Sequence, residues 1–530
     1  MTSNKLVGFV IVFIVNYLIK SAKCSDPYHG TLENELNSNG RSFIKERITP
    51  EQEMKTEYWF EKAQNCLKKR VNQKQNNGKA KNIIFFLGDG MSIATLTAAR
   101  ILKGQRNGLS GEEAVLTMEK FPHTGLSKTY CTNAQTADSA CSATAYLTGV
   151  KTNLRLIGVN AKVDYLNCLA SKDLDNHVES IALWAQQAGK STGIVTTTTI
   201  THASPSGNYA HVPSRHFESD FDIIKAGVLN PKDCLDIATQ LIENEPGKHF
   251  DVMMGGGQTK FIPFTQNDTF GSKGERRDGK DLIQKWKTEN PEGVFVSNLE
   301  ELNNLDYNNT KKVFGLFHSS HLDYNARKKV LNPSQPRLKD MTASAIKMLQ
   351  RNPKGYYVFI EGGRIDHGHH QNSAGYALDE TIEFDEAIQT ALEMTNDEDT
   401  LIVVTADHSH TMSMAGYPGR GNPILGLNEY DLDMDGVPYS VLNYAVGPKQ
   451  YIEVKDNTWK RIDLTEETHD FIVKPSYIKK LSGHHAGEDV AIFARGPQSH
   501  LFSGTMEQNV IPHLMAYAAC IGKGAKLCEE

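Results

Sequence analysis

The sequence has no long run of basic residues. Its 57 Lys and Arg residues are outnumbered by 63 Asp and Glu residues, and the formal net charge is −6 with both signs mixed along the chain. Proteins that bind nucleic acid usually carry a basic patch or stripe, because the phosphate backbone supplies most of their affinity. Nucleic acid is therefore not an expected partner.

Long hydrophobic runs are also scarce. The apolar stretch at residues 6–19 follows Lys5 and precedes the small residues Ser21 and Ala22. This order is typical of a secretory signal peptide, which we place at residues 1–24. The alternative is an uncleaved membrane anchor, although the stretch is short for a membrane span.

The last residues of the sequence, 522–530, contain no hydrophobic tail. A lipid anchor is added at a small-residue site before such a tail, so none is expected from this sequence. The mature protein is expected to be soluble and secreted. A cell-surface, lipid-anchored form is the alternative if the natural C-terminus extends further.

Cysteine is infrequent, with eight residues, of which seven remain after removal of Cys24 with the signal peptide. Spacing allows pairs in an oxidising compartment, although connectivity does not follow from sequence alone. The candidate pairs are Cys520 with Cys528, Cys131 with Cys141, and Cys168 with Cys234, which leaves Cys66 unpaired. The glycosylation sequons at Asn267 and Asn308 suit the same compartment.

The composition is that of a globular protein. Hydrophobic residues make up 39% and charged residues 23% of the 530 positions, which suits one large domain or several smaller ones. Short apolar runs alternate with helical patterns such as residues 341–349 and 378–392. This alternation predicts an α/β fold with a mainly parallel central sheet and helices on both faces.

Four of the apolar runs lead directly into polar, chemically capable residues. The carboxyl ends of parallel strands meet at one edge of a sheet, so these residues are expected to converge there. The four runs are residues 82–87 before Gly88-Asp89-Gly90, 193–197 before His202 and Ser204, 356–360 before residues 361–370, and 401–405 before Asp407 and His408.

The segment 361–370, Glu-Gly-Gly-Arg-Ile-Asp-His-Gly-His-His, is the most informative of these. It places two carboxylates and three imidazoles within ten residues of a strand end. Such groups are costly to bury unless something pairs with them. A divalent metal suits a mixed His and carboxylate set, and zinc suits it best. The segment therefore predicts a metalloenzyme.

The other motifs are less specific when taken alone. Asp89 between two glycines is also common in turns, and Asp407 could cap a helix beside a surface imidazole. His202 and Ser204 could be ordinary polar residues of a loop. Residues 255–257, three glycines, resemble a phosphate-binding loop but favour a tight turn after a strand.

A candidate nucleophile lies in the run of small residues 136–145. A helix that begins at Asp138-Ser139 would place the serine at its positive end, which favours an oxyanion or a phosphoryl group. The alternative is a capping pair in a tightly packed helix. Ser139 lacks the Gly-x-Ser-x-Gly context of lipase-type enzymes, so an acyl-transfer elbow is not predicted.

Taken together, these motifs resemble those of the animal alkaline phosphatases, in order from about residue 82 to residue 520. The motifs that carry the resemblance are Gly88-Asp89-Gly90-Met91, Asp138-Ser139-Ala140, His202-Ala203-Ser204-Pro205, residues 361–370, residues 405–410 and residues 485–490. The resemblance implies a phosphomonoesterase with two zinc ions and one magnesium ion, a phosphoserine intermediate at Ser139, and a phosphate-binding Arg215.

The resemblance also implies which residues hold each metal. The first zinc would be held by Asp366, His370 and His485, and the second by Asp89, Asp407 and His408 beside Ser139. The magnesium would be held by Asp89, Ser204 and Glu361, with His202 close to it. His367 and His369 are left as supporting residues.

The sequence departs from the family pattern at a fourth, calcium-like site. The positions aligned to two of its acidic ligands are His318 and Asn332, neither of which has a carboxylate, so calcium is not expected.

The family resemblance further implies a homodimer. An N-terminal segment, residues 25–80, would embrace the partner with a helix at residues 50–71, and a crown-like insertion at residues 411–483 would lie within the catalytic domain, residues 81–530.

The expected activity is hydrolysis of phosphate monoesters to inorganic phosphate and an alcohol. Nucleotide phosphodiesterases and sulfatases are the enzymatic alternatives. Ser204 and Glu361, which belong to the third-metal set, argue against a diesterase, and Ser139 lacks the Cys/Ser-x-Pro-x-Arg context of a sulfatase. An inactive secreted binding protein is the alternative of another class, and the loss of a ligand would favour it.

Overall fold

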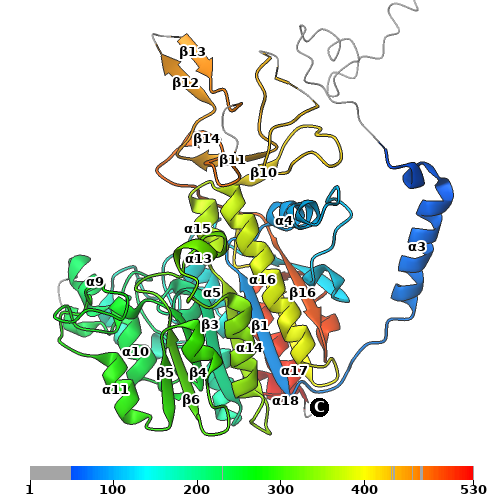
Figure 1. Cartoon of the computed structure of the whole chain (residues 1–530). Coiled ribbons are helices and arrows are strands. Elements are labelled where there is room, and N and C mark those ends of the chain that lie inside the picture. The colour runs from blue at the N-terminus through cyan, green and yellow to red at the C-terminus, as the bar shows by residue number, and fades with distance from the viewer. Residues whose placement is uncertain are drawn as a thin grey trace, which may run out of the picture.

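A computed structural model describes residues 49–528, apart from residues 229–230, 431, 434–435, 456–457 and 466–468. The predicted signal peptide and Cys24 lie outside the described residues. A ten-stranded sheet forms the centre of the molecule, with helices packed on both of its faces (Figure 1). The α/β class predicted from the sequence is confirmed.

The strand order in this sheet is β17-β2-β16-β8-β1-β7-β3-β4-β6-β5. From β8 to β5 all neighbours are parallel, whereas β16 is antiparallel to both β8 and β2. The strands of the sheet are β1 (Asn82–Gly88), β2 (His123–Lys128), β3 (Ser191–Thr199), β4 (Val252–Gly256), β5 (Gly293–Val296), β6 (Lys312–Leu316), β7 (Tyr356–Gly362), β8 (Thr400–Thr405), β16 (Val490–Arg495) and β17 (Gly504–Glu507).

Alternating side chains of the central strands enter two separate cores. In β1, Ile83, Phe85 and Leu87 contribute to one core, and Ile84 and Phe86 to the other. All seven residues of β1 are buried, as expected for an interior parallel strand covered on both faces. This is why the strand has a continuous apolar sequence and not an alternating one.

The helices divide between the two faces. Residues of α5, α7, α10, α11 and α17 join the core of Phe85, whereas residues of α14 and α16 join the core of Phe86. The helices are α3 (Thr56–Val71), α4 (Ile93–Arg106), α5 (Ser139–Thr148), α6 (Cys168–Lys172), α7 (Ile181–Gln187), α8 (Ala203–Ser206), α9 (Asp220–Lys225), α10 (Ile237–Glu243), α11 (Leu282–Glu289), α12 (Leu299–Asn303), α13 (Asn325–Leu331), α14 (Leu338–Leu349), α15 (Arg364–His370), α16 (Ala374–Met394), α17 (Ile511–Ala519) and α18 (Ala525–Cys528).

The predicted insertion at residues 411–483 lies beyond one end of the main sheet (Figure 1). It contains a three-stranded sheet and a two-stranded hairpin, and a short ladder joins its end to the main body. These strands are β10 (Met412–Met414), β11 (Leu442–Gly447) and β14 (Ser476–Lys479), then β12 (Ile452–Lys455) and β13 (Thr458–Arg461), and finally β9 (Ser409–His410) with β15 (His485–Ala486).

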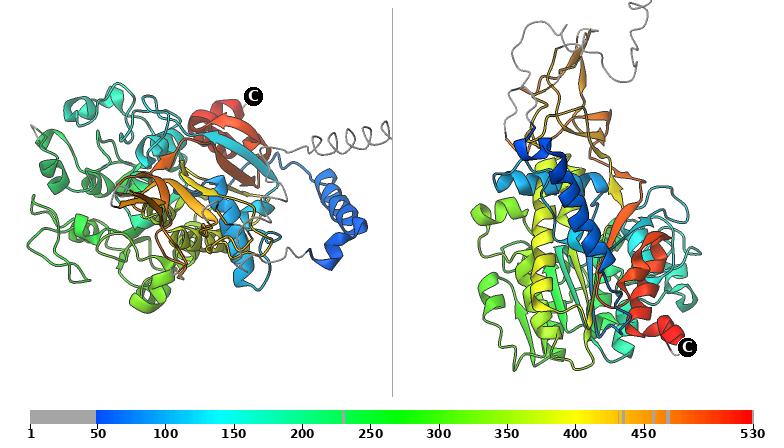
Figure 2. Two further views of the ribbon diagram at one scale, coloured as in Figure 1. Left: turned by 90° about the horizontal axis from the view of Figure 1, so that it is seen from above. Right: turned by 90° about the vertical axis from the view of Figure 1, so that its right-hand side faces the viewer.

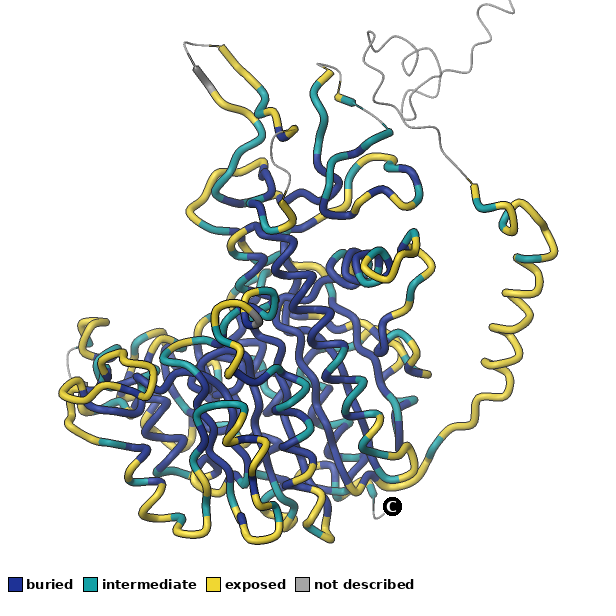
Figure 3. The backbone as a smooth tube through the Cα atoms, in the orientation of Figure 1, coloured by how far each residue is buried: buried dark blue, intermediate teal, exposed yellow. Residues whose placement is uncertain are grey.

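The helix predicted at residues 50–71 is present as a short 3-10 turn, η1 (Glu51–Met54), followed by α3. This helix stands away from the rest of the chain (Figure 1), as is also clear when the molecule is seen from above (Figure 2, left), and none of its residues is buried (Figure 3). Because none of its side chains is buried within the described part of the chain, the helix gains little there from tertiary contacts.

Three disulfides match the candidate pairs: Cys131 with Cys141, Cys168 with Cys234, and Cys520 with Cys528. Cys66, on α3, is free and exposed. Within the described part of the chain, no helix is both long enough and apolar enough to cross a membrane.

Candidate active site

The four strand-end motifs lie side by side, because β8, β1, β7 and β3 are consecutive in the sheet. Asp89 follows β1, Glu361 is the last residue but one of β7, and Asp407 follows β8. After β3 the chain continues through His202 into α8, which carries Ser204. The predicted convergence at one edge of the sheet is therefore confirmed.

Ser139 is the first residue of α5, and its side chain is buried beneath this edge. Asp138 precedes the helix as its N-cap, with its side chain accepting a hydrogen bond from the Cys141 amide. The Ser139 Oγ atom lies 3.2 Å from Nε2 of His408. Ser139 therefore lies at the amide end of α5 and beside the imidazole of His408, a side chain that commonly binds metals.

Arg215 approaches the serine from the loop that follows α8. Its Nη1 donates to Oδ2 of Asp138 over 3.1 Å, and its Nη2 lies 3.2 Å from Nε2 of His202. Burial opposes the charge of the guanidinium, but Asp138 and Asp89 outweigh it and raise the pKa of Arg215. A charged, planar donor is therefore held beside Ser139.

Asp366, His370 and His485 form the first of three clusters. Nε2 of His370 lies 3.3 Å from Oδ2 of Asp366, and Nε2 of His485 lies 3.4 Å from Oδ1 of the same residue. The two Nε2 atoms are 3.1 Å apart. This close approach brings together the three residues that the family resemblance assigned to one zinc.

The Nδ1 atoms of these histidines face carbonyl oxygens. Nδ1 of His370 is 2.7 Å from the oxygen of Gly483, and Nδ1 of His485 is 2.8 Å from that of Ala137. A carbonyl oxygen only accepts, so each Nδ1 carries a proton, and in the neutral imidazole each Nε2 keeps its lone pair. Both lone pairs are thus available to a cation beside Asp366.

His410 joins this cluster, although the sequence analysis gave it no role. Its Nε2 lies 2.5 Å from Oδ1 of Asp366, and its ring stacks on that of His369. His369 in turn lies between Thr95 and Tyr444, within hydrogen-bond distance of both. The only signal in the sequence was the position of His410 in the segment 405–410.

Asp89, Asp407 and His408 form the second cluster beside Ser139. Nε2 of His408 lies 3.1 Å from Oδ2 of Asp407 and 3.5 Å from Oδ1 of Asp89. Oδ1 of Asp407 accepts from the Gly90 and His408 amides, whereas Oδ2 has no hydrogen-bond partner. Both carboxylate oxygens of Asp89 are likewise buried without a partner.

Asp89, His202 and Glu361 form the third cluster, with Ser204 on the adjoining helix α8. Oε2 of Glu361 accepts hydrogen bonds from the hydroxyls of Thr196 and Thr198. Its Oε1 is buried without a partner, and so is Oγ of Ser204. The sequence analysis assigned no role to either threonine.

The pKa values describe the electrostatics of these clusters. Burial, together with the neighbouring carboxylates, raises the pKa of Asp89 well above its ordinary value. Burial also raises the pKa of Asp407 to about 6 and that of Glu361 to about 7. Buried carboxylates in such proximity need positive charge to ionise together.

The remaining histidines of the segment 361–370 have protein partners. Nδ1 of His367 lies 2.7 Å from Nη1 of Arg364, and its ring faces those of His202 and His321.

The two positions aligned to the calcium-like site lie elsewhere. Nδ1 of His318 accepts from the Ser320 amide, and Asn332 follows the end of α13. Within the described residues, His318 belongs to none of the groupings of His, Cys, Asp and Glu side chains that could hold a metal ion.

A family model and several known proteins match this chain over most of its length. The family model described as "Alkaline phosphatase" matches residues 80–521. The chain is 44% identical over 517 residues to the membrane-bound alkaline phosphatase of Bombyx mori, covering 96% of this chain and 92% of that protein. It is 43% identical over 490 residues to the tissue-nonspecific alkaline phosphatase isozyme of Homo sapiens, covering 91% and 92%.

Solved structures with the same fold include two bacterial alkaline phosphatases. That of Thermus thermophilus superposes with a TM-score of 0.59 at 22% identity, covering 84% of this chain and 92% of its own. That of the Antarctic bacterium TAB5 superposes with a TM-score of 0.57 at 22% identity, covering 84% and 99%. At this identity the likeness concerns the fold alone.

Proposed function

Because this chain belongs to the alkaline phosphatase family and is a phosphomonoesterase, we propose that it hydrolyses phosphate monoesters through a phosphoserine at Ser139, with two zinc ions and one magnesium ion. The first zinc would bind Asp366, His370 and His485. The second would bind Asp89, Asp407 and His408 beside Ser139. The magnesium would bind Asp89, Ser204 and Glu361, with His202 nearby.

The observation that carries this proposal is the set of buried oxygens without hydrogen-bond partners. They belong to Asp89, Asp407, Glu361 and Ser204, and all lie at one edge of the sheet. An unpaired buried polar atom is costly, and a cation satisfies several of them together. The donor types fit the metals, since zinc accepts His and carboxylate ligands and magnesium prefers oxygen.

When bound, the metal ions would lower the pKa of the serine hydroxyl and balance negative charge on the oxygens of the reaction. Ser139 then gives its hydroxyl proton to solvent and attacks phosphorus. A bond forms between its Oγ and the phosphorus atom while the bond to the oxygen of the leaving alcohol breaks. The position at the first turn of α5 favours this step, because helix N-termini stabilise anionic oxygens.

Arg215 binds the phosphoryl group during this step. Its guanidinium presents a planar set of donors that can contact two phosphate oxygens. Asp138 holds Nη1, which fixes the orientation of the guanidinium before substrate arrives. In the second step, water attacks the phosphorus of the phosphoserine, the bond to Oγ breaks, and Ser139 regains its proton as phosphate is released.

Assay of the purified protein on an aryl phosphate monoester tests the proposal. We expect turnover that is lost in Ser139→Ala, lost after treatment with a chelator, and restored by zinc and magnesium together. An aryl phosphodiester assayed alongside should react far more slowly. Equal turnover by Ser139→Ala, or turnover that no chelator affects, would contradict the assignment of the nucleophile or of the metals.

We also propose that the protein acts as a homodimer. Helix α3 exposes an apolar stripe that contains Trp59, Phe60, Leu67 and Val71, the last with 73% of its surface accessible. Phe60, Leu67 and Val71 are seven and four residues apart, so they lie on one face of the helix with Trp59 at its edge, and such a face is usually covered by another surface. A second copy of the chain is the proposed occupant, contacted by the N-terminal segment 25–80.

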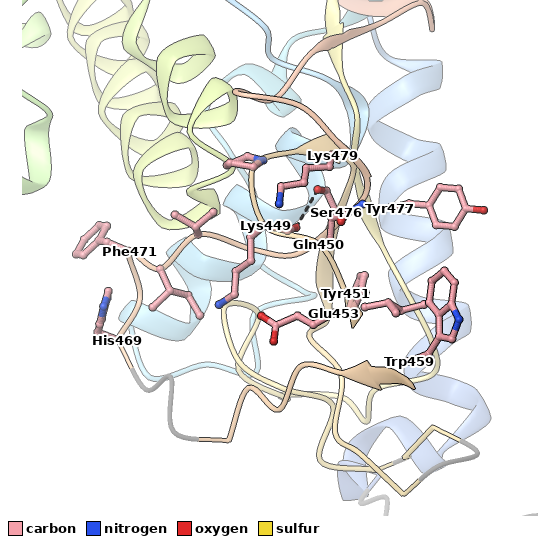
Figure 4. A pocket seen from close by; sticks show the side chains of 14 residues that line it. Lys449, Gln450, Tyr451, Glu453, Trp459, His469, Phe471, Ser476, Tyr477 and Lys479 are labelled. Carbon is pink, nitrogen blue, oxygen red and sulfur yellow. Dashed lines mark hydrogen bonds between the residues drawn. The ribbon is translucent and has the colours of Figure 1, made fainter. Parts of the chain in front are cut away.

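The insertion at residues 411–483 offers a further apolar surface for this dimer. Trp459, Tyr477 and Leu481 are largely exposed there. A hollow lies in the same region, with Lys449 and Glu453 among the side chains that line it (Figure 4).

Sedimentation of Phe60→Asp, with Lys62→Asp as a matched control, tests the proposed contact of helix α3 with a second copy. Weaker dimerisation of the first variant alone is expected, and a monomeric wild type would contradict it.

Secretion is proposed on the evidence of the disulfides and of the N-terminal apolar stretch. Asn267 and Asn308 are both exposed, so each sequon is accessible to glycosylation. Expression in a secreting eukaryotic cell, followed by N-terminal sequencing and enzymatic deglycosylation, tests both points. Protein that stays in the cell with residues 1–24 attached would contradict secretion.

A further inference from the structure

We propose that Thr196, supported by Thr198, is a positioning residue that holds Glu361 so that one of its carboxylate oxygens is left for the third metal. The inference rests on the proposed magnesium set, but it concerns residues outside that set. Both threonines lie on β3, and Glu361 lies on the adjacent strand β7, which β3 pairs with in parallel.

The strand register brings these side chains together. Thr196 is the residue of β3 paired with Glu361 of β7. Register partners of neighbouring strands have side chains on the same face of the sheet. Thr198 lies where the pairing of β3 with β4 becomes irregular, between Val195 and Thr199, and its hydroxyl reaches the same carboxylate. Contact between the carboxylate and these two hydroxyls is therefore built into the pairing of the strands.

The hydrogen bonds are arranged asymmetrically. Oε2 of Glu361 accepts from the Thr196 hydroxyl in a short bond, and from that of Thr198 over 3.2 Å. The other oxygen, Oε1, is fully buried without a partner. One oxygen of the carboxylate is thus fixed by the protein, and the other remains the available ligand atom of the cluster with Asp89 and His202.

Thr198 determines where the proton of Thr196 points. Oγ1 of Thr196 accepts from the Thr198 amide over 2.9 Å, and lies 2.7 Å from the Thr198 hydroxyl. The amide can only donate, so it occupies a lone pair of the Thr196 hydroxyl, whose single proton goes to Oε2 of Glu361. Thr196 is therefore the closer donor, and Thr198 supports it through its amide and by a second, longer hydroxyl bond to the same oxygen.

The packing leaves Glu361 little freedom to turn away. Glu361, Thr196 and Thr198 have no accessible surface. A Cβ atom at Gly363 would lie 2.4 Å from Cγ2 of Thr198 and 3.0 Å from Cδ of Glu361, so the chain passes directly against both side chains. Hydrogen bonds from other residues to a metal ligand, such as those from the threonines to Glu361, orient that ligand. Their removal typically lowers metal affinity by about 10- to 100-fold.

Titration of zinc-loaded, magnesium-depleted enzyme with Mg²⁺ tests the inference. The dissociation constant from calorimetry is the first readout, and the rise in melting temperature with Mg²⁺ is the second. For Thr196→Val we expect a dissociation constant about 10- to 100-fold higher, with unchanged zinc content and with activity recovered at high Mg²⁺. Thr196→Ser keeps the hydroxyl and should bind Mg²⁺ like the wild type.

Thr192→Val is the matched control, because Thr192 is a buried threonine of the same strand whose hydroxyl bonds to Gln186. It should not change Mg²⁺ binding. A folded Thr196→Val that binds Mg²⁺ with the wild-type constant overturns the inference. If Thr196→Val does not fold, Thr198→Val and Thr198→Ser decide instead: equal constants overturn the inference, and a weaker constant for the valine variant supports it. A wild type that binds no Mg²⁺ would contradict the proposed function itself.

Discussion

Oδ2 of Asp138 accepts a hydrogen bond from Nη1 of Arg215 over 3.1 Å, and Oδ1 of the same carboxylate caps α5 at Ser139. One side chain therefore positions both the proposed nucleophile and the arginine proposed to bind phosphate. The two functions can be separated by substitution, because an amide oxygen still caps a helix but carries no charge.

We expect Asp138→Asn to weaken the binding of inorganic phosphate by about tenfold, because the guanidinium loses a charged partner and a bond to a charged group is worth more than a neutral one. The inhibition constant of phosphate, measured in steady-state assays, reports this directly. The melting temperature should change little. Asp138→Ala should weaken phosphate binding and also lower the melting temperature, because it removes the helix cap as well as the charge. Unchanged phosphate inhibition in Asp138→Asn would show that Arg215 is oriented without the carboxylate.

His410 provides a second prediction. Its Nε2 contacts Oδ1 of Asp366, so loss of the imidazole should leave this proposed zinc ligand free to rotate. We expect His410→Ala to lower zinc affinity by about 10- to 100-fold, as for other residues that orient metal ligands. The rate at which a chelator removes zinc measures the effect.

The matched control for that experiment is His318→Ala, since His318 lies outside the three clusters and bonds to a backbone amide. The control should release zinc at the wild-type rate. Equal rates for His410→Ala and the wild type would mean that packing alone holds Asp366.

The pH dependence of stability depends in part on His211. Burial, and then the stacked His177, lower the pKa of His211 to about 3. Its ordinary pKa is near 6.5, so below that pH the unfolded chain takes up a proton that the folded chain resists. The free energy of unfolding should therefore fall by about 1.4 kcal/mol per pH unit between 6.5 and 3 on account of this group.

His211→Gln should remove that contribution and flatten the curve of unfolding free energy against pH below 6.5. Melting temperatures measured from pH 7 to pH 4.5 test this, with His249→Gln, an exposed residue, as the control. Any loss of metal at acid pH affects both variants alike. Parallel curves for His211→Gln and the wild type would contradict the assignment.

The disulfide between Cys131 and Cys141 closes a ring of backbone that contains Ala137, Asp138 and Ser139. Ala137 accepts from His485, so the ring contacts the first metal cluster as well. Replacing both cysteines by alanine should lower stability by about 2–4 kcal/mol and also lower kcat. The double replacement of Cys520 and Cys528, whose ring contains no residue of the site, should lower stability only. Equal kcat in both double variants would contradict this.

Much of the site could be predicted from the sequence because its residues directly follow apolar runs. Asp89, Glu361 and Asp407 each stand at the end of a buried strand, and parallel strands bring their ends to one edge. The start of α5 at Ser139 was likewise predicted from local composition, and Asp138 is its N-cap. These features depend on short stretches of chain.

The contacts that support the ligands could not be predicted in this way. His410 and Asp366 are 44 residues apart, Asp138 and Arg215 are 77 apart, and Thr196 and Glu361 are 165 apart. The pair of Thr196 and Glu361 depends on the register of β3 against β7, and that of Asp366 and His410 on the order β8-β1-β7. The pair of Asp138 and Arg215 depends on the packing of α5 against α8 and the loop that follows it. None of these arrangements follows from the pattern of apolar residues.

The most direct test of the account is to trap the intermediate. The zinc- and magnesium-loaded enzyme is mixed with an aryl phosphate, quenched in acid, digested, and analysed by mass spectrometry. We predict one phosphoryl group on the peptide that contains Ser139, and none there in Ser139→Ala or in enzyme stripped of metal. Rapid turnover with a phosphoryl group on another residue, or on none, would contradict the account.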